Sequence, residues 1–362
     1  MLNITTLLKS FALVTSLTLC STAFASESNA KKIPVKPSYQ QGEDRHFVDW
    51  REVQNFISTM QTEHHFELEQ LNTIFKQARY LESSIQLIKP APLNKPKNWK
   101  AYRARFVENG RIEAGSAFWE RNTEYLQRAE KEYGVPAEII VGLIGVETIY
   151  GKTTGNFRAI DSLTTLAFSY PNTANREARM AFFRSELMQL LLWSKESKTE
   201  LFSIKGSYAG ALGLAQFMPS SLRQYAVDFD GDGTINLSNS EADAIGSIAN
   251  YLAKHGWKKG LPYTFPATHV GQDEDKLREL LSQGLKASYQ LEQIKQTITA
   301  ADPLIPTQLL YGVVDLQNGP DPSEYWLATE NFFAITQYNR SYFYAMSVVD
   351  LGQVIALTRK KE

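Results

Sequence analysis

Apolar residues recur with helical spacing over much of the first half of the chain. The pattern covers residues 47–60, 67–81, 112–133 and 136–150, and it breaks at segments rich in proline or glycine such as residues 89–92. The same spacing returns over residues 341–359, near the end of the chain. The pattern therefore predicts a mainly helical protein whose C-terminal helix packs back on the earlier helices.

The pattern changes between residues 257 and 326. Short runs of β-prone residues, such as residues 308–316, are separated there by six prolines: Pro262, Pro266, Pro303, Pro306, Pro320 and Pro322. Proline interrupts helices and central strands, so this segment favours short strands joined by turns. We expect a small β-containing domain here. The predicted fold class is therefore mainly α, or α+β when this domain is counted.

The first residues have the order of a secretory signal peptide. Lys9 is followed by an apolar run over residues 11–19, and Ala23-Phe24-Ala25 offers a small-x-small cleavage site. That run is shorter than the roughly 20 apolar residues of a membrane-spanning helix. We therefore expect residues 1–25 to be a signal peptide and the mature protein to reach the periplasm.

Cys20, the only cysteine, leaves a second possibility open. The preceding residues 17–19 half resemble the lipid-attachment motif of bacterial lipoproteins, but that motif has a small residue where this chain has Leu19. Cleavage after Ala25 is thus favoured over an outer-membrane lipoprotein anchored through Cys20. In the favoured case the mature chain has no thiol, which excludes disulfides, cysteine nucleophiles and cysteine zinc sites.

The composition of the mature chain narrows the function classes further. Residues 26–43 are polar with two prolines and predict a flexible tether before the folded part. Loss of Lys9 with the signal peptide changes the formal net charge from -1 to -2, so no basic surface for nucleic acid is expected. The 6 Trp, 17 Tyr and 19 Phe suit a hydrophobic core and also the flat walls of a sugar groove.

Glu147 is the first candidate for chemistry. It lies on the helix predicted after Pro136, and Ile140, Leu143 and Ile144 precede it by seven, four and three residues on the same face. Poor hydration there would raise the pKa of a carboxyl group, as a general acid near neutral pH requires. The alternative is a structural glutamate at the border of the core, paired with an arginine such as Arg158.

A second candidate is the segment of residues 205–220, which is rich in glycine and alanine. Small residues let the backbone approach a ligand closely. Ser207 and Gln216 would supply hydrogen bonds to that ligand, and Met218 an adaptable apolar contact. The same composition also suits a tightly packed contact between helices, and the segment alone does not decide between the two.

Several motifs together resemble a known family, the membrane-bound lytic transglycosylase B family. They are Gly145-Val146-Glu147-Thr148 with Gly151, Ala159-Ile160-Asp161-Ser162-Leu163, Gly206-Ser207-Tyr208-Ala209-Gly210-Ala211, Gln216-Phe217-Met218-Pro219-Ser220-Ser221 and Ile335-Thr336-Gln337-Tyr338-Asn339. The resemblance extends over about residues 47 to 358, with the motifs in the family's order and with similar spacing.

The resemblance implies a lysozyme-like core, a flanking helical domain and a small β domain, with a sugar groove between them. On this basis we expect a helical domain at 44–133 completed by 345–362, the catalytic core at 134–256 completed by 327–344, and the β domain at 257–326. It also implies roles for individual residues. Glu147 matches the catalytic acid/base, and the groove residues are Tyr102, Ser207, Gln216, Met218, Tyr338, Asn339 and Tyr344.

The implied reaction cleaves peptidoglycan between N-acetylmuramic acid and N-acetylglucosamine without water and leaves a 1,6-anhydromuramyl end. It needs only one carboxylate, whereas most hydrolases of sugars use two. Asp161 is the nearest second carboxylate, but its motif suggests a structural role such as a helix cap. A muramidase that hydrolyses the same bond and a non-catalytic wall-binding protein remain the alternatives.

Residues 228–236 resemble the first part of an EF-hand calcium loop. Asp228, Asp230 and Asp232 supply side-chain oxygens, and Thr234 a backbone carbonyl. The bidentate glutamate expected at the last position is replaced by Asn239, although the family closes its loop with a later aspartate that matches Asp243. This chain has one extra residue before that position, so Glu241 and Asn239 stay open as the closing ligand.

Calcium, in a structural role, is therefore the one cofactor that we expect. The alternative is that Ser240 caps the next helix and Asp243 completes a capping box. The five histidines, His46, His64, His65, His255 and His269, show no metal-ligand spacing. We expect a monomer that acts on glycan strands, with cell-wall synthases or other wall enzymes as candidate partners and no nucleic acid.

Overall fold

The computed structural model describes residues 46–90 and 96–360. The predicted signal peptide, Cys20 and the predicted tether lie outside these residues. Most of the described chain is helical. Its α-helices are α1 (Arg51–His64), α2 (Leu68–Gln77), α3 (Glu82–Ile88), α4 (Trp99–Arg103), α5 (Asn109–Arg121), α6 (Thr123–Tyr133), α7 (Ala137–Thr148), α8 (Ala159–Phe168), α9 (Arg176–Ser197), α10 (Pro219–Tyr225), α11 (Glu241–Lys254), α12 (Glu274–Leu281), α13 (Leu291–Ile294), α14 (Glu330–Tyr338) and α15 (Tyr342–Arg359).

The strands form two sheets of unequal size. Strands β1 (Phe157–Arg158) and β2 (Lys205–Gly206) make a short antiparallel pair. The larger sheet has the order β4-β6-β7-β3-β5, with β3 (Thr264–His269), β4 (Tyr289–Gln290), β5 (Ile298–Ala300), β6 (Leu310–Asn318) and β7 (Asp321–Ala328). The predicted combination of a mainly helical fold with a small sheet is confirmed.

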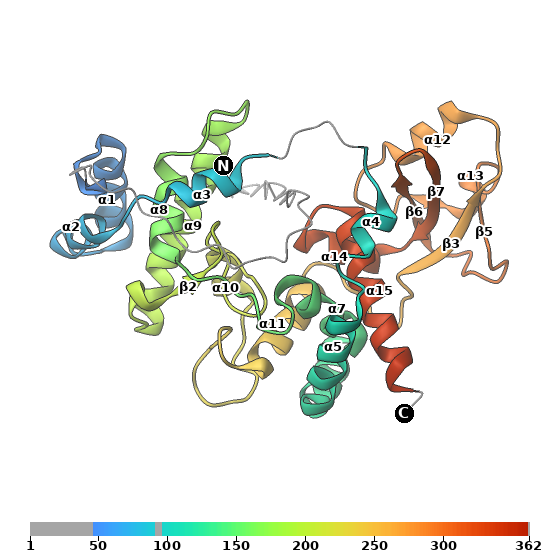
Figure 1. Cartoon of the computed structure of the whole chain (residues 1–362), viewed down its shortest axis with the longest axis horizontal. Coiled ribbons are helices and arrows are strands. Elements are labelled where there is room, and N and C mark those ends of the chain that lie inside the picture. The colour runs from blue at the N-terminus through green and yellow to red at the C-terminus, as the bar shows by residue number, and fades with distance from the viewer. Residues whose placement is uncertain (1–45, 91–95, 361–362) are drawn as a thin grey trace, which may run out of the picture.

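The two faces of the larger sheet belong to different cores. In the β6–β7 hairpin, Val313 pairs with Leu327, and both side chains join a small apolar cluster with Leu277 of α12. Val314, one residue further along β6, joins the main core instead. Alternation along the strands thus attaches the sheet to the helical body. Figure 1 shows the sheet at one end of the molecule and the α1–α2 pair at the other.

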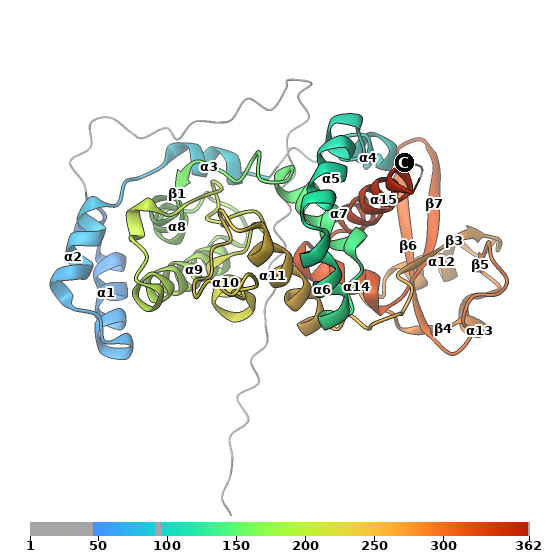
Figure 2. The ribbon, with the colours of Figure 1, turned by 90° about the horizontal axis from the view of Figure 1, so that it is seen from below.

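Helix α7 lies between α5 and α15 and packs along α15 (Figure 2). Glycines allow the two backbones to approach closely. A β-carbon on Gly142 of α7 would collide with the carbonyl oxygen of Val348, and one on Gly352 of α15 with that of Glu138. The last helix of the chain is therefore fixed against the helix that contains Glu147.

Two helix boundaries differ from those predicted. The helical pattern over residues 112–133 is divided into α5 and α6 at Asn122, whose side-chain amide donates to the Phe118 carbonyl and to Glu241. Helix α7 ends at Thr148, although the helical pattern extends to residue 150. In both cases the cause is a contact with a segment distant in sequence, which a periodic pattern does not contain.

No helix in residues 46–90 and 96–360 has the length and apolar character to cross a membrane.

Candidate active site

Glu147 lies near the C-terminal end of α7, the most apolar of the described helices. Ten of the twelve residues of α7 are buried, and only Glu138, in the first turn, and Glu147, in the last, reach the surface. The helix begins directly after Pro136, as predicted, because proline fixes a suitable backbone angle there. The Glu147 carboxyl group is half-buried above a helix made largely of isoleucine, valine and leucine.

A buried tyrosine is bonded directly to this carboxyl group. Tyr344, in the first turn of α15, is 4% exposed, and its hydroxyl donates a hydrogen bond to Glu147 Oε1 at 2.5 Å. Burial raises the pKa of the Tyr344 hydroxyl well above its ordinary value, and the negative charge of Glu147 raises it further. The tyrosine therefore stays protonated and remains a donor to the carboxylate.

Two further predicted groove residues lie within electrostatic reach of Glu147. Burial raises the pKa of Tyr102 to about 12; Arg105 opposes the change and the Glu147 charge adds to it. Burial and then the same charge raise the pKa of Tyr338 well above its ordinary value. The Tyr338 hydroxyl donates to the Ala215 carbonyl at 2.5 Å. The structure thus gathers three of the predicted tyrosines around one carboxyl group.

The glycine-rich segment forms a tight loop beside α7. Within it, Ser207 Oγ accepts hydrogen bonds from the backbone amides of Ala209 and Ala211, at 3.3 and 3.0 Å. Gln216 has a left-handed backbone with φ 49°, and its side-chain amide donates to the carbonyls of Thr154 and Gly213, at 3.0 and 2.9 Å. These predicted ligand-binding groups therefore also hold the loop in shape.

Thr148, which the site prediction did not include, joins this loop to the helix of Glu147. Its hydroxyl donates to the Leu214 carbonyl at 3.1 Å and accepts from the Gly151 amide at 3.2 Å. Thr148 is fully buried. Its place directly after the candidate acid in the sequence was the only signal that could have identified it.

Met218 and Asn339 lie at the ends of neighbouring elements. Met218 occupies the position before α10 and packs against the main core, and Asn339 follows the last residue of α14. Both side chains are half-buried. Their contact with a sugar stays a prediction.

Asp161, the candidate for a second catalytic carboxylate, is instead bonded to structural partners. It is fully buried and accepts hydrogen bonds from Arg158 Nε at 2.6 Å and from the Arg79 amide at 3.0 Å. Burial raises the pKa of Asp161, and the bonds from Arg158 and Arg79 oppose that change. The expected helix-cap role was wrong, because Arg158 occupies the N-cap position of α8. Asp161 instead ties the segment after α2 to α8.

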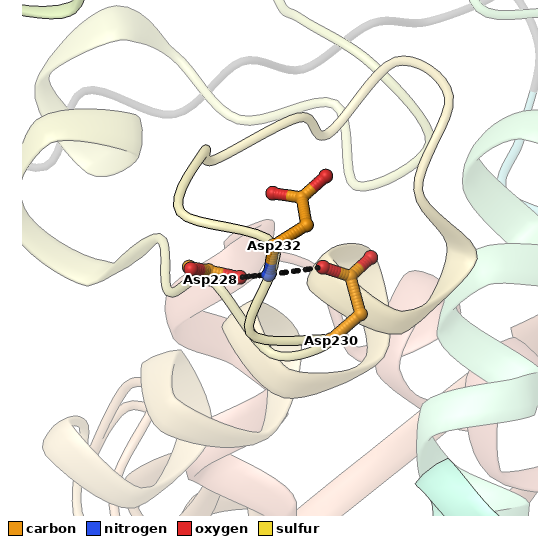
Figure 3. Close-up of side chains that lie close together, drawn as sticks. All are labelled: Asp228, Asp230 and Asp232. Carbon is orange, nitrogen blue, oxygen red and sulfur yellow. Dashed lines mark hydrogen bonds between the residues drawn. The ribbon is translucent and has the colours of Figure 1, made fainter.

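Asp228, Asp230 and Asp232 converge on the loop before α11, as predicted (Figure 3). One carboxylate oxygen from each lies within 4.8 Å of the others at the protein surface. Backbone amides arrange the three side chains; Asp228 accepts from Gly231 and Gly233 at 2.7 and 2.8 Å. Asp232 accepts from both the amide and the hydroxyl of Thr234, at 2.7 and 2.6 Å.

Asp243 does not belong to this group of three. It is fully buried, and its two oxygens accept from the amides of Phe229 and Asn236, each at 2.7 Å. Ser240 caps α11 by accepting from the Asp243 amide at 3.1 Å, as the alternative interpretation expected. The capping box that it also expected does not form, because the Ser240 amide donates to the Asn236 carbonyl and not to Asp243. Glu241 forms an ion pair with Arg121 at 2.6 Å. Asp243 therefore fixes both ends of the loop to α11.

Comparisons with known proteins agree with this geometry. The family model described as "Transglycosylase SLT domain" matches residues 49–353. The membrane-bound lytic murein transglycosylase B of Escherichia coli (strain K12) is 40% identical over 326 residues, which cover 86% of this chain and 85% of that protein.

Solved structures show the same relationship. The catenated lytic transglycosylase SltB1 of Pseudomonas aeruginosa is 41% identical with a TM-score of 0.78, covering 86% of this chain and 99% of that one. The Escherichia coli lytic transglycosylase Slt35 in complex with calcium is 40% identical with a TM-score of 0.76, covering 89% and 97%. The chain is a member of the transglycosylase SLT domain family.

Proposed function

We propose that this protein is a peptidoglycan lytic transglycosylase that uses Glu147 as its single acid and base. It cleaves the MurNAc-β-1,4-GlcNAc bond and forms 1,6-anhydro-MurNAc ends. The observation that best supports this is the hydrogen bond from the buried Tyr344 to Glu147, which orients the carboxyl group at the end of α7. The relatives, which are lytic transglycosylases by name, favour the same reaction.

In the first step, Glu147 gives its proton to the oxygen between the two sugars. The bond from this oxygen to muramyl C1 breaks, and its electron pair stays with the leaving N-acetylglucosamine. In the second step, the muramyl C6 hydroxyl attacks C1 and its proton returns to Glu147. The intramolecular attack gains from proximity, and the substrate's acetamido group takes the stabilising role of a second carboxylate.

The surrounding residues keep Glu147 in place during both steps. Tyr344 donates to Oε1 and so holds the carboxyl group in one orientation. We place the sugar units along Tyr102, Ser207, Gln216, Met218, Tyr338, Asn339 and Tyr344.

We also propose that the loop before α11 binds one calcium ion that stabilises the fold. Three acidic side chains within 4.8 Å of one another repel unless a cation is bound, and oxygen is the ligand that calcium prefers. Asp228, Asp230, Asp232 and the Thr234 carbonyl would hold the ion. Asp243 would support this loop through the bonds that it accepts from the Phe229 and Asn236 amides.

The protein would act in the periplasm on glycan strands, as a monomer that works with other wall enzymes. Export follows from the predicted signal peptide. The alternative to test is attachment to the outer membrane through a lipid on Cys20. Labelling of the mature N-terminus by mass spectrometry distinguishes a chain that begins after Ala25 from one that begins with a lipid-modified cysteine.

Mass spectrometry of the sugars released from purified peptidoglycan tests the main proposal. The mature protein should release muropeptides that are lighter by one water than hydrolysed products, and Glu147→Gln should release none. Reducing-end products would mean a muramidase with a second catalytic group. No release by either protein would favour a wall-binding protein.

A further inference from the structure

The backbone directly after Glu147 and Thr148 adopts an unusual conformation. Ile149, Tyr150 and Gly151 all have positive φ angles, of 51°, 54° and 89°. Side chains of L-residues rarely tolerate this left-handed region, and β-branched side chains such as isoleucine tolerate it least. Such a run persists only where neighbouring contacts hold it.

The Tyr150 side chain supplies those contacts. It is 8% exposed, and its ring lies 5.2 Å from that of Phe118 of α5, centroid to centroid. Its hydroxyl lies where a β-carbon on Gly115 would come within 2.5 Å, and one on Gly145 would also collide with it. Two glycines thus form a slot that fits this tyrosine. Gly145 lies on α7, two residues before Glu147, and Gly115 lies on α5.

The Tyr150 hydroxyl forms no hydrogen bond with the described residues, although it is buried. An unpaired buried hydroxyl is unfavourable, so hydrogen bonding is not what keeps the tyrosine here. The shape of the aromatic ring is the remaining reason. Because Phe118 and the two glycines enclose the ring, the turn that carries it can adopt only one conformation.

We infer that Tyr150 is a positioning residue for Glu147. By filling the slot between α5 and α7 it locks the left-handed turn, and the turn fixes the last helical residues and with them the direction of the Glu147 carboxyl group. Tyr150 contacts neither the substrate nor the reacting atoms. The inference rests on Glu147 as the proton donor, but it applies to transglycosylation and hydrolysis alike.

The test compares Tyr150→Phe and Tyr150→Leu with the wild-type enzyme. The phenylalanine variant keeps the ring and should keep kcat. The leucine variant frees the turn and should lower kcat by about 10- to 100-fold, since small misplacements of a catalytic group have effects of this order. KM should stay within about twofold, because substrate contacts are intact.

Phe75→Leu is the matched control. Phe75 is a fully buried aromatic residue in α2, away from α7, so its loss should lower the melting temperature without lowering kcat. A kcat for Tyr150→Leu no lower than that of the control would overturn the inference, and so would a Tyr150→Phe variant as slow as Tyr150→Leu. The mass of the products reports separately on the proposed reaction.

A second test starts from α5. Gly115→Ala places a methyl group within 2.5 Å of the Tyr150 hydroxyl and should lower kcat, although Gly115 lies on a different helix. The methyl group would also come within 2.4 Å of Ile355 Cδ1, but that atom is the end of a flexible side chain and can rotate away. Combining it with Tyr150→Phe removes the colliding oxygen and should restore part of the lost activity. If the double variant is as slow as Gly115→Ala alone, the collision with Tyr150 is not the cause and the inference fails.

Discussion

The end of α7 and the loop before α11 both present carboxylates, but in opposite surroundings. Glu147 is one acid on a helix with ten buried residues, and a tyrosine hydroxyl is bonded to it. Asp228, Asp230 and Asp232 are three acids on a surface loop, where backbone amides donate to them. The first arrangement suits proton transfer and the second suits a cation, so the neighbours of a carboxylate determine its use.

Replacement of the acid itself should have the largest effect. Glu147→Gln keeps the shape but removes the proton, so the rate of anhydro-product release should fall by about 10²- to 10⁴-fold with no change in melting temperature. Glu138→Gln is the control, because Glu138 is the other surface residue of α7. Equal losses in the two variants would mean that the helix, and not the acid, is responsible.

Loss of the bond to the acid should have a smaller effect. Tyr344→Phe removes the hydroxyl that donates to Glu147, and kcat should fall by about tenfold, as expected for a hydrogen bond to a charged group. Tyr342→Phe lies two residues away on α15 and loses only a bond to the Gly284 carbonyl, so it should remain active. A fully active Tyr344→Phe would remove the proposed role of this bond.

Calcium should change stability and leave catalysis alone. An excess of about 100 times the dissociation constant stabilises a folded protein by about 2.7 kcal/mol, which corresponds here to a rise of about 5 °C in melting temperature. Scanning calorimetry with calcium and with a chelator measures the difference. Asp230→Asn should abolish it, whereas Asp275→Asn on the surface of α12 should not. An unchanged melting temperature in the wild type would contradict the calcium proposal.

The smallest effect that we expect concerns Glu186 and the pH dependence of stability. It is 3% exposed and accepts hydrogen bonds from the amide and hydroxyl of Ser220, at the start of α10. Burial raises its pKa above the ordinary 4.5, with the Ser220 bonds opposing. The folded state therefore holds this proton more tightly than the unfolded state, and its contribution to stability is lost as pH rises from 4.5 through the folded pKa.

Glu186→Gln lacks this titration. The variant should gain stability relative to the wild type as pH rises from about 4 to 7, by about 1.4 kcal/mol for each unit of pKa shift. Urea unfolding at the two pH values gives the difference. A gap between variant and wild type that stays constant with pH would mean that the Glu186 pKa is not raised.

The helices and the acid could be predicted because both depend on neighbours in the sequence. The α7 pattern predicts a buried helix, and Pro136 marks its start. The end of that helix could not be predicted, since Ile149 and Tyr150 adopt left-handed angles only because Phe118, Gly115 and Gly145 enclose the tyrosine. The division at Asn122 likewise depends on Glu241, which lies 119 residues further along the chain.

The candidate site shows the same limit. Without the family resemblance, no pattern in the sequence predicts that Tyr344 contacts Glu147. The contact depends on the packing of α15 on α7, which the sequence pattern does not contain. Thr148 was missed since its partner is a backbone carbonyl, which every residue possesses. The clustering of the three aspartates in residues 228–236 could be predicted because a short loop determines its own geometry. The place of Asp243, which was named as a ligand but bonds to the Phe229 and Asn236 amides, depends on how α11 packs against the loop.

The close packing of α15 on α7 has a consequence for the order in which the site assembles. Glu147 and Tyr344 are 197 residues apart, and the tyrosine lies on α15, the last of the described helices. A chain synthesised only as far as α14 possesses its acid without this hydrogen-bond donor and without the helix that packs along α7. The acid therefore reaches its final surroundings only when α15 has been made and has packed on α7.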